Sequence, residues 1–131
     1  MKLTTNDQKK LSYLHPDLCK VINRCAQMTK IPFMVMETSR SKQQQMKNIA
    51  NHVSQTMHSR HLVSSDGLAR AADLVPIDDK GKPIWAWPVY HKFAPEMKAA
   101  AKYVGVNIEW GGDWLRFKDG PHFQLSWKEY P

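Results

Sequence analysis

Residues 106 to 127 read VNIEWGGDWLRFKDGPHFQLSW, and we expect two strands of a sheet in this segment. The first strand is predicted over 106–110, followed by a turn at Gly111-Gly112. The second is predicted over 122–127 and begins at His122. Asp119 lies three residues before His122, across a Gly-Pro turn, so both side chains can reach one point at the end of the sheet.

The N-terminal part of the chain alternates helix and strand. An amphipathic helix is predicted over 16–29, because Pro16 suits a first helical turn and apolar residues recur on one face. A strand follows over 33–37. Ser39 can then cap a further helix that contains residues 43–50, which are good helix formers.

The central part is predicted as loop, strand and helix. No period holds over 51–67, and a loop of this length in a small domain is usually functional. A strand is predicted over 68–77. A second helical stripe covers 89–104, with a kink at Pro95 or a helix that begins there, and Gly105 ends it. This mixed order predicts the α+β class, with a small, mostly antiparallel sheet flanked by helices.

Length and composition indicate one globular domain over residues 1–131. Hydrophobic residues make up 42% of the chain and charged residues 24%, which excludes a disordered protein. The first residues contain no apolar signal core, so we expect the protein in the cytoplasm where it is made. Cys19 and Cys25 are too poorly placed on one helix for a disulfide, and we expect them to pack as apolar side chains.

The formal net charge of +7 favours polyanionic partners. The basic residues are spread along the chain, and no recognition-helix or ribonucleoprotein motif accompanies them. Two interpretations stay open on charge alone. The basic residues form an ordinary solvated surface, or they attract the protein to anionic polymers of a cell envelope.

Four residues in three separate segments can form a hydrolytic metal site. A catalytic zinc needs three protein ligands, and two histidines with one carboxylate are one such set. His61, Asp73 and His122 can supply it, and Asp119 can take a proton from a nearby water. Each also has an ordinary interpretation: a surface histidine, a capping or salt-bridged aspartate, and for Asp119 an Asx turn.

The three segments resemble a known family, the zinc D-alanyl-D-alanine carboxypeptidases and phage L-alanyl-D-glutamate endopeptidases. The family's motifs are matched here by Ser59-Arg60-His61, Ala71-Ala72-Asp73 and Asp119-Gly120-Pro121-His122. The stretch WGGDWLRFKDGPHFQL at 110–125 is similar to phage endolysins of this type, and the resemblance extends from about residue 33 to residue 125. It implies a Hedgehog/DD-peptidase-like fold.

The resemblance also implies roles for individual residues. Zn2+ would be held by His61, Asp73 and His122, with Asp119 as the general base. Arg40 would bind the substrate and stabilise charge on the scissile carbonyl oxygen. Ser59 would help to position the substrate.

For Asp66 and Asp113, both a role in the metal site and a role in a turn are possible. Twelve residues separate His61 from Asp73, more than is usual in the family, so Asp66 is an alternative ligand. Asp73 is favoured because it keeps the expected strand context, whereas Asp66 precedes a glycine and resembles a turn residue. Asp113 is predicted either to orient a metal ligand from the second shell or to hold its own turn.

The resulting hypothesis is a phage endolysin that hydrolyses the stem peptide of bacterial peptidoglycan at the L-Ala–D-Glu bond. We expect a monomer that also attracts anionic envelope polymers, without specific nucleic-acid binding or membrane insertion, and that reaches the wall when released from the host cytoplasm. A D-Ala-D-Ala carboxypeptidase is the alternative within the class. A non-catalytic basic module that binds wall polymer or nucleic acid is the alternative outside it.

Overall fold

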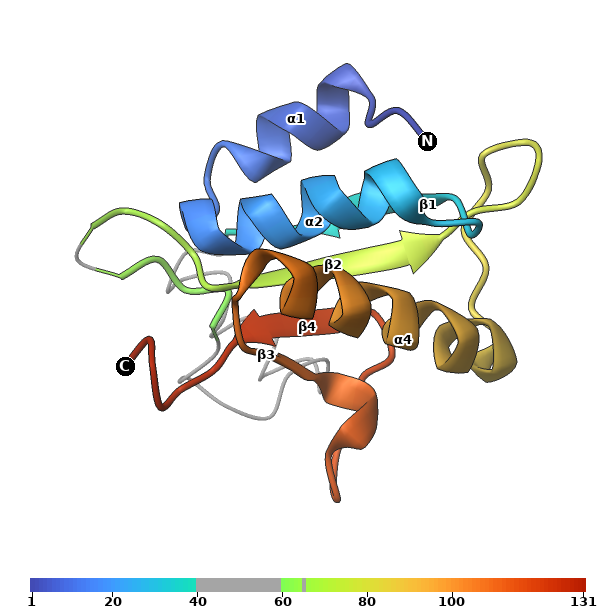
Figure 1. The fold of residues 1–131 in the computed structure, drawn as a ribbon. Helices are drawn as coiled ribbons and strands as arrows, with labels where there is room; N and C mark the ends of the chain where they lie inside the picture. Colours follow the sequence, from blue (N-terminus) through green and yellow to red (C-terminus); the bar gives the residue numbers. More distant parts are fainter. Residues whose placement is uncertain (40–59, 65) are drawn as a thin grey trace, which may run out of the picture.

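The structure is a computed structural model that describes residues 1–39, 60–64 and 66–131 (Figure 1). Three α-helices, four strands and one 3-10 helix form within these residues. In chain order they are α1 (Thr5–Leu11), α2 (Pro16–Met28), β1 (Phe33–Glu37), β2 (Ala71–Pro76), α4 (Trp87–Val104), β3 (Ile108–Trp110), the 3-10 helix η1 (Gly111–Asp113) and β4 (His122–Leu125).

The strands form one antiparallel sheet in the order β1-β2-β4-β3. Helices α2 and α4 lie side by side across one face of it, and α1 lies beyond α2 (Figure 1). This confirms the predicted α+β class with a small antiparallel sheet.

The two faces of the sheet have different chemistry because side chains alternate along each strand. Ala72 and Leu74 of β2, with Phe123 of β4, belong to the hydrophobic core that the helices cover. Asp73 and His122 occupy the intervening positions and therefore lie on the opposite face. The sheet thus separates the folding core from the polar residues singled out in the sequence.

Helix α2 confirms the predicted helix. It begins at Pro16, and the ring of His15 accepts a hydrogen bond from the backbone N–H of Asp17 at 3.1 Å. Cys25 is buried on this helix and Cys19 is half-buried, and both are free thiols.

Helix α4 includes Pro95 within its length, whereas one of the two alternatives from the sequence had the helix begin at that proline. It starts at Trp87, so the expected start at Pro95 is wrong. Pro88 occupies the first turn, where a missing N–H costs nothing, while Phe93 and Met97 are buried on either side of the internal proline. Packing of that face keeps the helix continuous through a residue that local rules disfavour.

Other elements differ from the prediction at their edges. Gly111-Gly112 opens a 3-10 helix rather than a simple turn, and β4 ends at Leu125, two residues earlier than expected. Gly105 ends α4 in the left-handed conformation, as predicted, with φ of 76°. The capping role of Ser39, the helix at 43–50 and most of the 51–67 loop involve residues outside the described part.

The short helix α1 was missed by the sequence analysis. Its signal is a capping box, in which Asp7 N donates to Thr4 Oγ1 at 3.1 Å and Thr4 N donates to Asp7 Oδ2 at 3.0 Å. The other oxygen of Asp7 accepts from Val35 N at 2.9 Å and so fixes α1 to β1. In the described part of the chain, no helix combines the length and hydropathy that a membrane span requires.

The Asp7 carboxylate should therefore be important for stability. Asp7→Ala leaves the N–H groups of Thr4 and Val35 without this partner, and we expect a loss of about 3 kcal/mol in the free energy of unfolding. Urea denaturation measures it. The control is Asp79→Ala in an exposed turn, which should change stability by less than about 0.5 kcal/mol. Equal effects of the two variants would contradict the assignment.

Candidate functional site

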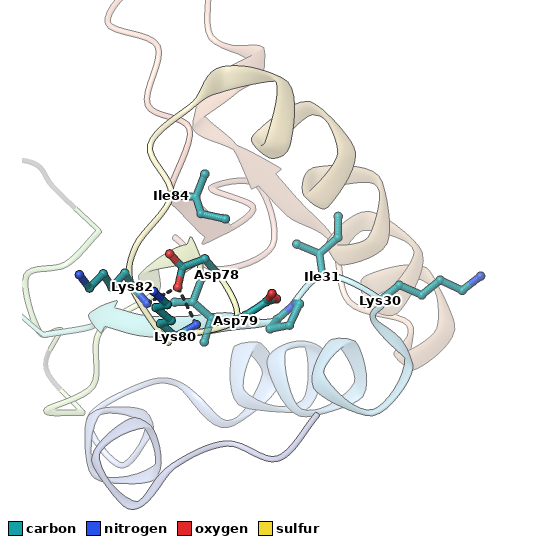
Figure 2. Close-up of a pocket in the computed structure, with 9 residues that line it drawn as sticks. Lys30, Ile31, Asp78, Asp79, Lys80, Lys82 and Ile84 are labelled. Atoms are coloured by element: carbon teal, nitrogen blue, oxygen red, sulfur yellow. Dashed lines mark hydrogen bonds between the residues drawn. The ribbon is translucent and has the colours of Figure 1, made fainter.

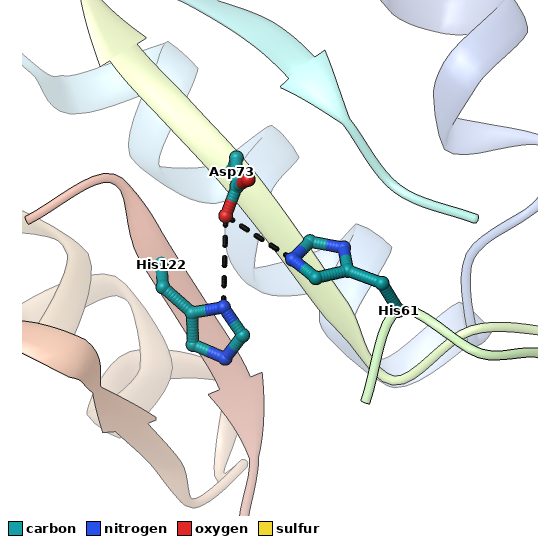
Figure 3. A group of neighbouring side chains, drawn as sticks. All are labelled: His61, Asp73 and His122. Atoms are coloured by element: carbon teal, nitrogen blue, oxygen red, sulfur yellow. Dashed lines mark hydrogen bonds and ion pairs between the residues drawn. The ribbon is translucent and has the colours of Figure 1, made fainter. Parts of the chain in front are cut away.

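Three of the predicted residues meet on the open face of the sheet. Asp73 and His122 are direct partners in the β2–β4 register, so the strand pairing itself brings them together. His61 comes from the segment before β2. Asp73 Oδ1 lies 3.2 Å from His61 Nε2 and 3.6 Å from His122 Nδ1. Figure 3 shows both rings directed at this one carboxylate oxygen.

The far nitrogen of each ring is held by an acceptor. His61 Nδ1 lies 2.9 Å from the carbonyl oxygen of Thr38, which can only accept a hydrogen bond. His122 Nε2 lies 2.7 Å from Gln124 Oε1. With protons on these two nitrogens, His61 Nε2 and His122 Nδ1 would present lone pairs to a metal ion. Without an ion, the same two nitrogens can carry a proton and donate to Asp73.

This arrangement suits a cation between the three residues. Two nitrogen lone pairs and a carboxylate oxygen repel one another unless a proton or a metal ion lies between them. The three ligand atoms all lie within 4.8 Å of one another. A tetrahedral zinc with ligands at about 2.1 Å would hold them about 3.4 Å apart. The donor set and its spacing therefore fit a metal ion.

The electrostatics keep Asp73 ionised. Burial on its own would raise the pKa of the Asp73 carboxyl, but hydrogen bonds with His122 and His61 and the charges of those rings outweigh it. The pKa consequently stays well below its ordinary value. At neutral pH the group is a carboxylate, which is the form a metal binds.

Asp119 is held beside this group by tight main-chain contacts. Its N–H donates to Gly111 O at 3.1 Å, and His122 N donates to Asp119 O at 3.3 Å. The pKa of Tyr90 is affected by burial and by both Asp119 and Asp73. Burial raises the pKa of Tyr90 to about 12, with further contributions from the charges of Asp119 and Asp73. The two carboxylates therefore act on one neighbouring side chain.

The sequence of the whole chain was compared with models of known protein families. The model of the phage L-alanyl-D-glutamate peptidase family matches residues 1–125. The chain belongs to this family. The membership confirms the resemblance drawn from the sequence motifs.

Individual relatives agree with the family assignment. The chain is 40% identical over 100 residues to the L-alanyl-D-glutamate peptidase of Listeria phage A118. The aligned region covers 76% of this chain and 32% of that protein. It is 28% identical over 121 residues to the L-alanyl-D-glutamate peptidase of Escherichia phage T5, covering 86% of this chain and 81% of that protein. The chain thus spans about a third of the length of the Listeria phage relative.

A solved structure shares the whole fold. The crystal structure of the Serratia marcescens L-Ala D-Glu endopeptidase ChiX superposes with a TM-score of 0.88 at 37% identity. The match covers 100% of this chain and 94% of the Serratia chain. The α+β architecture described above is therefore shared with this Serratia enzyme.

The remaining site predictions have different outcomes. Arg40 and Ser59 lie outside the described residues, so their roles stay predictions. Asp66 is exposed, and its carboxylate pairs with Arg70 at 3.0 Å, which leaves Asp73 as the carboxylate beside the histidines.

Asp113 lies at the end of η1, where its carboxylate accepts from Lys98 Nζ at 2.6 Å. This ion pair is exposed to solvent. It connects η1 to α4, and both proposed roles of Asp113, holding its own turn and orienting a metal ligand, stay predictions.

Several supporting residues were missed by the sequence analysis. Gln124 lies two residues after His122 on the same strand face, and this alternation could have revealed it. Thr38 contributes only a backbone carbonyl, for which the sequence contains no signal. The ring of Trp114 packs on the ring of His122 with centroids 4.9 Å apart, which limits how that ligand can turn.

A separate groove is lined by residues that follow the C-terminal end of β2 and precede β1 (Figure 2). Asp78 Oδ1 there accepts from the N–H groups of Lys80 and Lys82, both at 2.9 Å, which makes a closed turn. Its lining mixes acidic, basic and apolar groups without a convergent ligand set. The main lining residues are Lys30, Ile31, Asp78, Asp79, Lys80 and Lys82.

The close approach at Gly111 gives a test of the site. A Cβ there would lie 2.4 Å from Asp119 O and 3.1 Å from His122 Cβ. Gly111→Ala should therefore displace Asp119 and His122. We expect a stability loss of about 2 kcal/mol and about a hundredfold loss of the hydrolytic activity that such a site would support.

The matched control is Gly81→Ala. Gly81 has a φ of 77° and no atom near an added Cβ, so the change strains the backbone away from the site. It should lower stability by about 1 kcal/mol and leave activity unchanged. Activity assays with thermal melts separate the two effects, and an active Gly111→Ala protein would refute the proposed contact.

Proposed function

We propose that this chain is a phage endolysin, a zinc-dependent peptidase that hydrolyses the L-Ala–D-Glu bond in the stem peptide of bacterial peptidoglycan. The observation that carries the proposal is the group formed by His61, Asp73 and His122, whose ligand atoms converge while the far ring nitrogens lie beside acceptors. The names of the relatives and of the Serratia enzyme support the choice of bond.

The proposed chemistry assigns one task to each described residue. His61, Asp73 and His122 would hold zinc, which supplies a Lewis acid and a water of lowered pKa. Asp119 would take the proton from the water that attacks the L-Ala carbonyl carbon. When the C–N bond breaks, Asp119 would return that proton to the departing amine of D-Glu. Arg40 and Ser59 would bind the substrate.

The basic surface supports a polyanionic target. Next to Trp114, the connection between η1 and β4 carries Leu115 and Phe117, which are 97% and 66% exposed, together with the exposed cations Arg116 and Lys118. The η1 region extends away from the sheet in Figure 1. Such a mixture of cationic and apolar groups suits contact with peptidoglycan, whose stem peptides carry carboxylates.

Metal binding can be tested apart from catalysis. Zinc should raise the melting temperature of the wild-type chain, because an ion that binds only the folded state stabilises it by about 4 kcal/mol at a thousand times its dissociation constant. EDTA should reverse the rise. His122→Ala removes one ligand and should abolish the zinc-dependent shift, as measured by thermal melts and elemental analysis. A shift retained in His122→Ala would contradict the ligand assignment.

The general-base role predicts a different variant. Asp119→Ala should keep the zinc-dependent rise in melting temperature while hydrolysis of purified sacculi falls by a factor of about 100 to 10000. Asp79→Ala serves as the carboxylate control and should retain full activity. If Asp119→Ala remains active, another group must accept the proton.

Mass spectrometry of the digested sacculi identifies the bond. Cleavage at L-Ala–D-Glu creates a new N-terminal glutamate, whereas a carboxypeptidase would release terminal D-Ala. A wild-type protein that binds sacculi and zinc without producing either product would favour a non-catalytic wall-binding module.

A further inference from the structure

Arg60, the residue before His61, is a buried cation with an unusual set of partners. Its side chain is only 6% exposed. Nη2 donates to Leu125 O at 3.3 Å and Ser126 O at 3.4 Å, and it also contacts Tyr130 O. The guanidinium carbon lies 3.7 Å from the centre of the Trp127 ring.

These partners place Arg60 against the C-terminal segment, residues 126–131. This segment follows the part of the chain that the family model matches, which ends at residue 125. It is fixed to the body at two other points. Tyr130 Oη donates to Asp17 Oδ2 at 2.7 Å, and Trp127 N donates to Glu109 Oε2 at 3.1 Å.

The main chain of Arg60 is also fixed. Its carbonyl oxygen accepts from Arg70 N at 2.9 Å, and Arg70 O accepts from Leu125 N at the same distance. Arg60 is therefore connected to the end of β4 through both its backbone and its side chain. Because His61 follows directly, the position of the His61 Cα depends on these contacts.

Packing alone does not explain why residue 60 is an arginine. The hydrogen-bond partners of its guanidinium among the described residues are neutral carbonyls, and burying a cation against neutral groups is costly. A methionine or leucine would fill the same space without this cost. Only a guanidinium can also bond several carbonyls and stack on an indole.

We propose that Arg60 is a positioning residue that connects the metal ligand His61 to the C-terminal segment 126–131, so that this segment supports the metal site. The inference rests on the proposed function, since it assumes that His61 binds zinc. The ring of His61 is oriented by Thr38 O, and Arg60 sets the backbone from which that ring projects. The C-terminal segment then contributes to zinc affinity without contacting the ion.

The test compares zinc affinity in point variants of the full chain. Arg60→Gln removes the charge and the stacking, and we expect zinc affinity to fall about tenfold, the lower end of losses seen when groups supporting a ligand are changed. Trp127→Ala, at a side chain 49% exposed, should lower it in the same direction by a smaller factor. The zinc affinity of Arg60→Lys should lie between that of Arg60→Gln and that of the wild type.

Arg24→Gln is the matched control. Arg24 lies on α2 with its guanidinium carbon 3.6 Å from the centre of the Tyr103 ring, and its Nε, like that of Arg60, is buried without a partner among the described residues. We expect it to change the melting temperature as much as Trp127→Ala does, while zinc affinity stays at the wild-type value.

Competition against a chromophoric chelator measures the affinity, and circular dichroism with thermal melts checks folding. If Arg60→Gln does not fold, Trp127→Ala and Arg60→Lys decide the question. The inference is overturned if these variants lose melting temperature but bind zinc as tightly as the wild type. If the wild-type chain itself binds no zinc, the proposed function fails first, and the His122→Ala measurement shows which of the two has failed.

Discussion

The antiparallel register between β2 and β4 is the constraint on which the candidate site depends. It places Asp73 directly opposite His122, so two of the three converging groups are fixed by backbone hydrogen bonds. A slip of one residue would turn Asp73 toward the helices and Ala72 toward His122. The alternating apolar residues prevent this slip, because Ala72, Leu74 and Phe123 must remain in the core. Formation of the core and assembly of the site are therefore one event.

The third group, His61, depends on less regular structure. It lies outside the sheet and is directed by Thr38 O at the end of β1 and by the contacts of Arg60. The polar face of the sheet consequently receives one candidate ligand from each of three segments that are distant in sequence. Asp119 joins them through Gly111, whose missing side chain permits the approach of the two backbones.

Much of this arrangement could be predicted from the sequence, because it follows local patterns. Helix α2 has a proline at its start and a regular apolar stripe, and Gly105 ends α4 as its position suggested. The candidate metal group was predicted from chemistry and family resemblance, since spacing alone left His61, Asp73 and His122 with ordinary interpretations. Asp73 rather than Asp66 lies beside the two histidines, in the strand context that the sequence analysis used to prefer it.

What the sequence could not predict depends on tertiary contacts. Helix α4 continues through Pro95 because Phe93 and Met97 are buried around it, and no local rule contains that information. Thr38 acts through a carbonyl group that every residue possesses. The buried position of Arg60 could not be predicted either, because an arginine in a polar segment is expected at the surface.

The division of the sheet into an apolar and a polar face has a practical consequence for protein engineering. Thermostability can be sought in the helical layer, by filling space around α2 and α4 or improving their surfaces, without altering the groups that would meet a substrate. Changes of specificity belong to the other side, where residues on loops and strand ends surround the histidines. A library that randomises one side can therefore be combined with a library on the other, with the strands as the shared boundary that must be kept constant.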